Sequence, residues 1–132
     1  YSVFRIKRDL LKKSTVGLML LNKSSLDGYG YNRGAGLDFG LAFGQSLKIG
    51  GFAAKTFSPD LKGDDHAANL YCAWDSDLII ADVAYTDIGE NFNAEMGFIP
   101  RTDIRKLKSN LGIGPRPNIL NIRQTIFFNN FN

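Results

Sequence analysis

The chain of 132 residues is poor in the residue types that build disulfides and zinc sites: it has one cysteine, Cys72, and one histidine, His66. A single cysteine forms no disulfide within the chain, and one Cys with one His cannot supply a structural zinc site. Long apolar runs are also absent. The longest, residues 16–21, falls far short of the ~18 to 20 apolar residues of a membrane-spanning helix and contains Gly17.

Charge and composition narrow the class of protein further. Sixteen Lys and Arg against 13 Asp and Glu give a net charge of only +3, so we expect no nucleic-acid partner. A hydrophobic content of 44% is too high for a disordered chain. Fourteen glycines and ten phenylalanines favour an all-β protein.

Residues 36–44 are the most informative segment. Leu37, Phe39, Leu41 and Phe43 alternate with Gly, Asp, Gly, Ala and Gly, a period of two that predicts a β-strand. One face of this strand carries large apolar side chains, and the other carries mostly glycine and alanine. Small residues on the second face indicate a crowded or curved interior, as in a membrane β-barrel whose apolar face meets lipid.

The same alternation recurs along the chain and predicts about eight strands. We place them at residues 2–10, 15–22, 34–43, 47–57, 67–74, 78–86, 103–112 and 119–128. Each has about the ~9 to 11 residues that a tilted strand needs to cross a bilayer. Gly44-Gln45-Ser46 predicts a tight hairpin. No helical segments alternate with the strands, so we expect an antiparallel up-and-down sheet, forming part of an outer-membrane β-barrel.

The faces of the predicted strand at 78–86 are consistent with a barrel wall. Asp82 falls on the face opposite Val83 and Tyr85, where a water-filled lumen would accept its charge. The alternation alone also fits a soluble barrel or sandwich that turns its large residues inward and binds a small apolar ligand.

The segment from Thr86 to Arg101 is the candidate binding loop. It is punctuated by Gly and Asn, and its aromatic residues could fold back onto a barrel rim or into the lumen. The residues that we single out for binding are Glu90, Asn91, Phe92, Asn93, Phe98 and Arg101. A plain connection between strands is the competing interpretation.

We expect no cofactor, metal site or catalytic residue. Asp64, Asp65 and His66 form the one polar cluster that suggests a metal, but too few ligands accompany them. Glu90 and Glu95 could act as an acid–base pair, which keeps a glycan-acting hydrolase as an alternative function.

The candidate loop also carries a family resemblance. Asp87-Ile88-Gly89-Glu90-Asn91-Phe92-Asn93, followed by Gly97-Phe98-Ile99-Pro100-Arg101, resembles a motif of a bacterial family of unknown function. Segments 5–9, 14–17, 31–33, 36–39 and 51–56 resemble further segments of that family, in the same order. Its domain commonly follows a family-nine-type carbohydrate-binding module in surface proteins of Gram-negative bacteria.

The resemblance implies that residues 1–132 are a single segment of a larger β-barrel domain, with both ends internal. It implies a location in the bacterial outer membrane and a role in anchorage or passage at the surface. The implied partners are outer-membrane lipid, the rest of the barrel or neighbouring surface subunits, and glycan through another domain.

Overall fold

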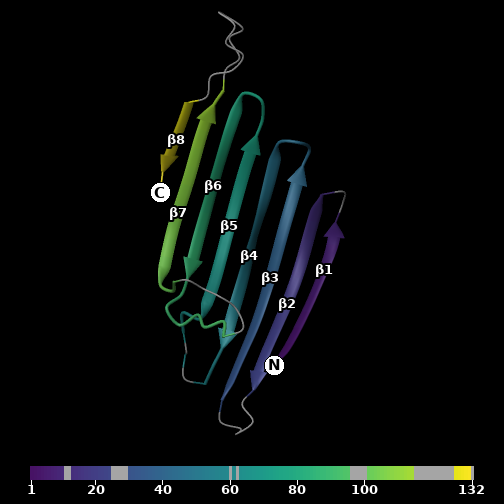
Figure 1. The fold of residues 1–132 in the computed structure, drawn as a ribbon, viewed down its shortest axis with the longest axis vertical. Coiled ribbons are helices and arrows are strands. Elements are labelled where there is room, and N and C mark those ends of the chain that lie inside the picture. The colour runs from purple at the N-terminus through teal and green to yellow at the C-terminus, as the bar shows by residue number, and fades with distance from the viewer. Residues whose placement is uncertain are drawn as a thin grey trace, which may run out of the picture.

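The computed structural model describes residues 1–10, 13–24, 30–59, 61, 63–95, 101–114 and 127–131. They form a single sheet of eight strands in the order β1-β2-β3-β4-β5-β6-β7-β8, with every strand antiparallel to its neighbours (Figure 1). The strands are β1 (Ser2–Leu10), β2 (Ser14–Ser24), β3 (Tyr31–Phe43), β4 (Leu47–Phe57), β5 (His66–Asp75), β6 (Ile79–Ile88), β7 (Ile104–Ile113) and β8 (Phe127–Phe131). The predicted all-β, up-and-down arrangement is confirmed.

Strand ends differ from the sequence prediction where cross-strand pairing overrides local polarity. Ser24 pairs with Tyr31, so β2 and β3 continue into residues that were predicted as loop. Asp87 pairs with Arg105, which extends β6 beyond Thr86. Of the strand predicted at 119–128, residues 119–126 lie outside the described residues, and β8 continues past Phe128 to Phe131.

The hairpin between β3 and β4 is as tight as predicted. Gly44 has a φ of 64°, in the left-handed region that glycine enters without a steric cost. The backbone N–H of Asp75 donates to the carbonyl oxygen of Ser46 at 2.9 Å, which ties the next hairpin to this one.

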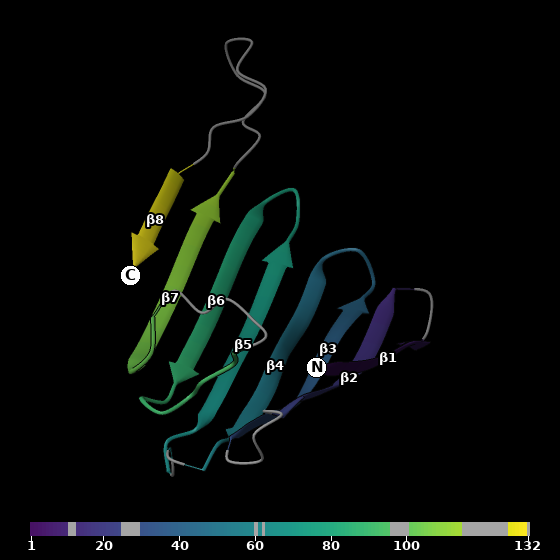
Figure 2. The same ribbon diagram turned by 60° about the horizontal axis from the view of Figure 1, so that its bottom comes forward.

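The sheet is one layer and has almost no core of its own. Among the described residues, Ala67 and Phe92 are the only buried apolar side chains. Figure 2 shows a curved, open layer with β1 and β8 at opposite edges. Nothing in the described part of the chain forms a helix of the length and hydropathy needed to cross a membrane.

Candidate functional site

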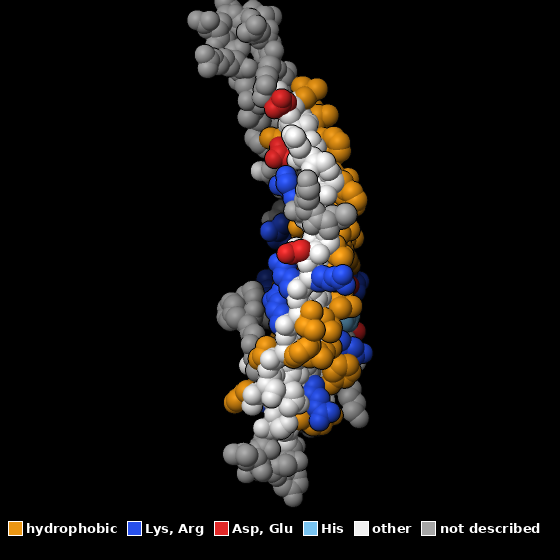
Figure 3. Space-filling view, turned by 90° about the vertical axis from the view of Figure 1, so that its right-hand side faces the viewer, with side chains coloured by type: hydrophobic (Ala, Val, Ile, Leu, Met, Phe, Trp, Pro, Cys, Tyr) orange, Lys and Arg blue, Asp and Glu red, His pale blue; other side chains and the backbone are white. Residues whose placement is uncertain are grey.

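The sheet has two chemically different faces, as the period-two pattern predicted. The apolar face carries Leu37, Phe39, Leu41 and Phe43 of β3. The register extends this face to the neighbouring strands and on to β8; examples are Val16 and Leu18 on β2, Ile49 and Ala53 on β4, and Phe127 and Phe131 on β8. In the side view of Figure 3, hydrophobic side chains form a nearly continuous strip along one side of the sheet. All but five of the large apolar side chains exposed in the described residues lie on this face; the exceptions are Tyr1, Val3, Phe52, Tyr71 and Leu78.

The apolar face ends in a row of charged residues where β3, β5 and β7 begin and β4 and β6 end. We call this row the charged boundary; it consists of Arg33, Lys55, His66, Asp87 and Arg105. It does not run straight across the strands. Between β3 and β7, the register shifts the boundary along the strand direction by four residues. This shift equals two residue pairs on the same face.

This stagger has the size expected of tilted strands. A shift of about one residue per strand, with a rise of ~3.3 Å and a strand spacing of ~4.8 Å, corresponds to a tilt of about 35°. Strands of membrane β-barrels tilt by ~35 to 45°, so a level membrane surface crosses them along such a staggered line.

Aromatic rings accompany the charges of the boundary. The guanidinium of Arg33 lies 5.0 Å from the centre of the Tyr31 ring, and the Lys55 ammonium lies 5.7 Å from that of Phe57. Phe43 and Trp74 lie at the other end of the face, beside Leu47. Aromatic girdles at both ends of an apolar band are typical of membrane β-barrels.

Arg8 is the one charged residue of the described strands that lies on the apolar face away from the charged boundary. It pairs with Val16. The next residue pair on the same face, Leu10 with Ser14, is the last one before the turn between β1 and β2. An arginine so close to the end of a strand can extend its guanidinium to water while its stem covers apolar surface.

The opposite face, which we call the small-residue face, carries glycines and paired polar groups. A Cβ atom added to Gly17 would lie 2.5 Å from the Asp38 carboxylate, which itself pairs with Arg5 at 3.2 Å. Asp82 lies on this face, away from Val83 as predicted, and its Oδ2 accepts a 2.7 Å hydrogen bond from Asn110. Asp38 and Asp82 are therefore each paired with a polar or charged partner on this face.

The segment after β6, residues 89–95, folds back onto the small-residue face. Its Phe92 is only 7% exposed and lines a small cavity together with residues of β2, β3 and β4. The residues that share this cavity with Phe92 include Met19, Leu21, Gly34, Gly36, Ala54 and Thr56. Phe92 is one of the aromatic residues that we expected to fold back onto a barrel rim or into the lumen, and the structure places it against the small-residue face. We call residues 89–95 the folded loop.

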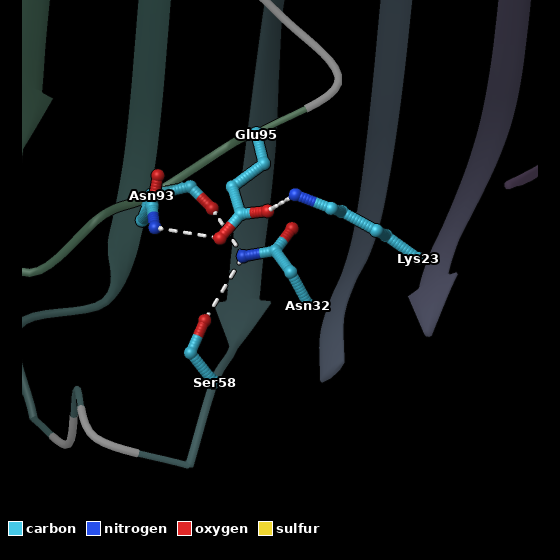
Figure 4. Close-up of polar contacts among 5 residues, drawn as sticks. All are labelled: Lys23, Asn32, Ser58, Asn93 and Glu95. Atoms are coloured by element: carbon cyan, nitrogen blue, oxygen red, sulfur yellow. Dashed lines mark hydrogen bonds and ion pairs between the residues drawn. The ribbon is translucent and has the colours of Figure 1, made fainter. Parts of the chain in front are cut away.

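Buried polar groups of β3 and β4 hold the folded loop in place (Figure 4). The Asn32 side-chain amide donates to Ser58 Oγ at 2.9 Å and to the carbonyl oxygen of Asn93 at 2.8 Å. The backbone N–H of Asn93 donates to Thr56 Oγ1 at 3.1 Å. Beyond these bonds, Glu95 forms an ion pair with Lys23 of β2, so the loop spans three strands.

The predicted binding residues divide into anchors and exposed groups. Asn91 is an anchor: its backbone N–H donates to Asp64 O at 3.1 Å and its side chain donates to Gly63 O at 3.0 Å. Glu90 and Arg101 are exposed, and no described carboxylate pairs with Arg101. Phe98 lies outside the described residues.

Sequence reasoning missed the residues that receive the loop. Lys23, Asn32, Thr56 and Ser58 lie 34 or more residues before Phe92 along the chain. Asn32 and Thr56 are each only 3% exposed. A polar residue inside a strand is a weak signal by itself, and only the cross-strand register brings these residues together.

Beside the folded loop lies an open pocket of about 660 Å³. Its lining includes Tyr1, Lys23, Tyr31, Asn32, Asn93 and Glu95. Glu90 lines a different pocket, together with His66 and Asp87, so the structure does not bring Glu90 and Glu95 to one site. Within the described ranges, no group of three or more His, Cys, Asp and Glu side chains is arranged to hold a metal ion.

Comparisons of the chain with protein-family models, with curated proteins and with solved structures found no match.

Proposed function

We propose that this chain forms part of the wall of an outer-membrane β-barrel in a Gram-negative bacterium. Its apolar face meets lipid and its small-residue face lines the lumen. The barrel serves anchorage or passage at the cell surface, linked to carbohydrate capture by another domain. The observation that carries this proposal is the exposed apolar face, which runs through all eight strands and ends at a staggered charged boundary.

The dimensions of the strands support a membrane-spanning role. Strands β1 to β7 have 9 to 13 residues, against the ~9 to 11 that cross a bilayer when tilted. On β6 the apolar stretch from Ile79 to Tyr85 covers about 20 Å of strand at ~3.3 Å per residue.

The lack of a core supports the same environment. A protein in water gains stability by removing apolar surface from solvent, at about 25 cal/mol per Å². Here the large apolar side chains point away from the single layer, so folding in water would bury little of their surface. Lipid tails would surround these side chains without a second protein layer.

The folded loop gives the proposed lumen a specific shape. It lies on the small-residue face near the ends of β4 and β5, so it would narrow one mouth of the barrel (Figure 1). Further strands would be needed to close the wall between β1 and β8 and to remove their free edges.

Two neighbouring residues of β6 test the orientation. Val83 lies on the apolar face, 42% exposed and mid-strand, and Ala84 lies on the small-residue face. A lysine at the bilayer midplane on a lipid face costs about 2–4 kcal/mol, whereas lumen substitutions are tolerated. In the full-length protein, Val83→Lys is expected to reduce folding stability in lipid vesicles by that amount, and Ala84→Lys by much less.

The measurement is the free energy of unfolding in urea, with the heat-dependent gel mobility of the folded barrel as the check on assembly. A larger loss for Ala84→Lys than for Val83→Lys would reverse the proposed orientation. If Val83→Lys and Ala84→Lys were both as stable as the wild type in buffer without lipid or detergent, the membrane role would be refuted. That result would favour a soluble protein that covers its apolar face.

A further inference from the structure

The charged boundary contains a cation that the described residues leave without a countercharge. Lys55 pairs with Asp65 at 3.2 Å, and Arg105 lies 3.6 Å from Asp87. Arg33 donates to the side-chain oxygen of Asn22 at 3.2 Å and lies over Tyr31, but no described carboxylate pairs with it. Its positive charge is therefore available to an external anion.

Lys55 stands next to Arg33 across the β3–β4 ladder. Arg33 pairs with Phe57, which makes Lys55 its diagonal neighbour on the same face. Diagonal neighbours lie about 7–8 Å apart, a distance that two long side chains can close around one anion. The Lys55 side chain is 56% exposed and the Asp65 side chain 14%, so the ammonium end of this ion pair is open to solvent and to an external anion.

We propose that Arg33 and Lys55 bind the phosphate groups of lipid headgroups where the apolar face meets water. This inference rests on the proposed membrane function. Guanidinium and ammonium groups are the usual protein ligands of phosphate. Tyr31 and Phe57 flank them, and rings with an apolar body and nearby polar groups favour the headgroup level of a bilayer.

The position of Arg33 and Lys55 at the edge of the apolar face favours a lipid headgroup over other anions. Ala35 pairs with Lys55 and Leu37 follows it on the same face, so acyl chains would begin directly beside the two cations. A ligand that carries both a phosphate and an apolar tail matches this arrangement, in which two cations lie next to an apolar surface. The phosphate should be anionic overall, since a neighbouring choline would cancel its attraction.

A reporter at position 35 tests the inference in the full-length protein. In a Cys72→Ala background, Ala35→Cys carries a fluorophore, and the protein is placed in phosphatidylcholine vesicles. A small fraction of brominated phosphatidylglycerol or brominated phosphatidylcholine then quenches it. The anionic lipid is expected to quench more at equal fraction, since each basic residue near the surface enriches it about fivefold.

Arg33→Gln with Lys55→Gln is expected to make the two lipids quench equally. The matched control, Lys106→Gln with Lys108→Gln, removes the same charge from the small-residue face and should leave the preference intact. Equal quenching by both lipids before substitution, or a preference that survives Arg33→Gln with Lys55→Gln, would overturn the phosphate site alone. No quenching by either lipid would instead refute the lipid-facing orientation.

Discussion

Removal of the Phe92 ring should release the folded loop without unfolding the sheet. Phe92 is only 7% exposed, so most of its surface is withdrawn from solvent. Complete burial of a Phe side chain stabilises by about 1.5–3 kcal/mol, so Phe92→Ala should raise the open fraction of the loop about 10- to 150-fold. The sheet should persist, because its backbone ladders do not involve Phe92.

Hydrogen exchange of the full-length protein in detergent measures this release. The amides of Asn91 and Asn93, bonded to Asp64 O and Thr56 Oγ1, should exchange faster by the same factor. Amides in the β6–β7 ladder should keep their rates. Phe52→Ala is the matched control, because Phe52 lies on the same face, is 42% exposed and is outside the group around Phe92. Unchanged exchange at Asn91 and Asn93 in Phe92→Ala would refute the anchoring role.

Two further substitutions test the contacts that hold the folded loop in place. Gly89→Ala places a Cβ atom 1.9 Å from the carbonyl oxygen of Asp64, so it should accelerate hydrogen exchange at Asn91. In the control Gly40→Ala, the new Cβ atom lies 3.6 Å from Thr15 Oγ1, and exchange at Asn91 should not change. Equal effects of the two variants would contradict the close approach of Gly89 to Asp64. Asn32→Asp replaces a buried donor by an acceptor facing Asn93 O and should destabilise the closed loop by about 1–3 kcal/mol, measured as faster exchange at Asn93. Wild-type exchange in Asn32→Asp would show that this hydrogen bond does not hold the loop.

The strand pattern could be predicted because one face of the sheet is uniformly large and apolar. Leu37, Phe39, Leu41 and Phe43 identify β3 without knowledge of its neighbours, and Leu47–Phe57 has the bounds that the sequence predicted. The ends of strands were less accurate. Ser24 and Tyr31 look like loop residues in isolation, and they join the ladder because their partners are present.

The binding loop illustrates the limit of a local pattern. Its Gly, Asn and Phe residues indicated a special segment, and Phe92 is buried where this segment folds back onto the sheet. The same residues that suggested ligand contact turn out to make internal contacts: Asn91 to Asp64, and Asn93 to Thr56. Such partners are more than 25 residues distant in sequence, so only the three-dimensional register distinguishes an anchor from a ligand-binding group.

Site-directed labelling of β3 in native membranes tests the two-faced wall most directly. In the full-length protein with Cys72→Ala, single cysteines replace Leu41 and Phe43 on the apolar face and Gly40 and Ala42 on the small-residue face. The expected result is that 41 and 43 react with lipid-soluble probes, whereas 40 and 42 react with aqueous ones. If 41 and 43 are shielded from both probes while 40 and 42 are wet, the apolar face is covered by protein and the membrane wall is wrong.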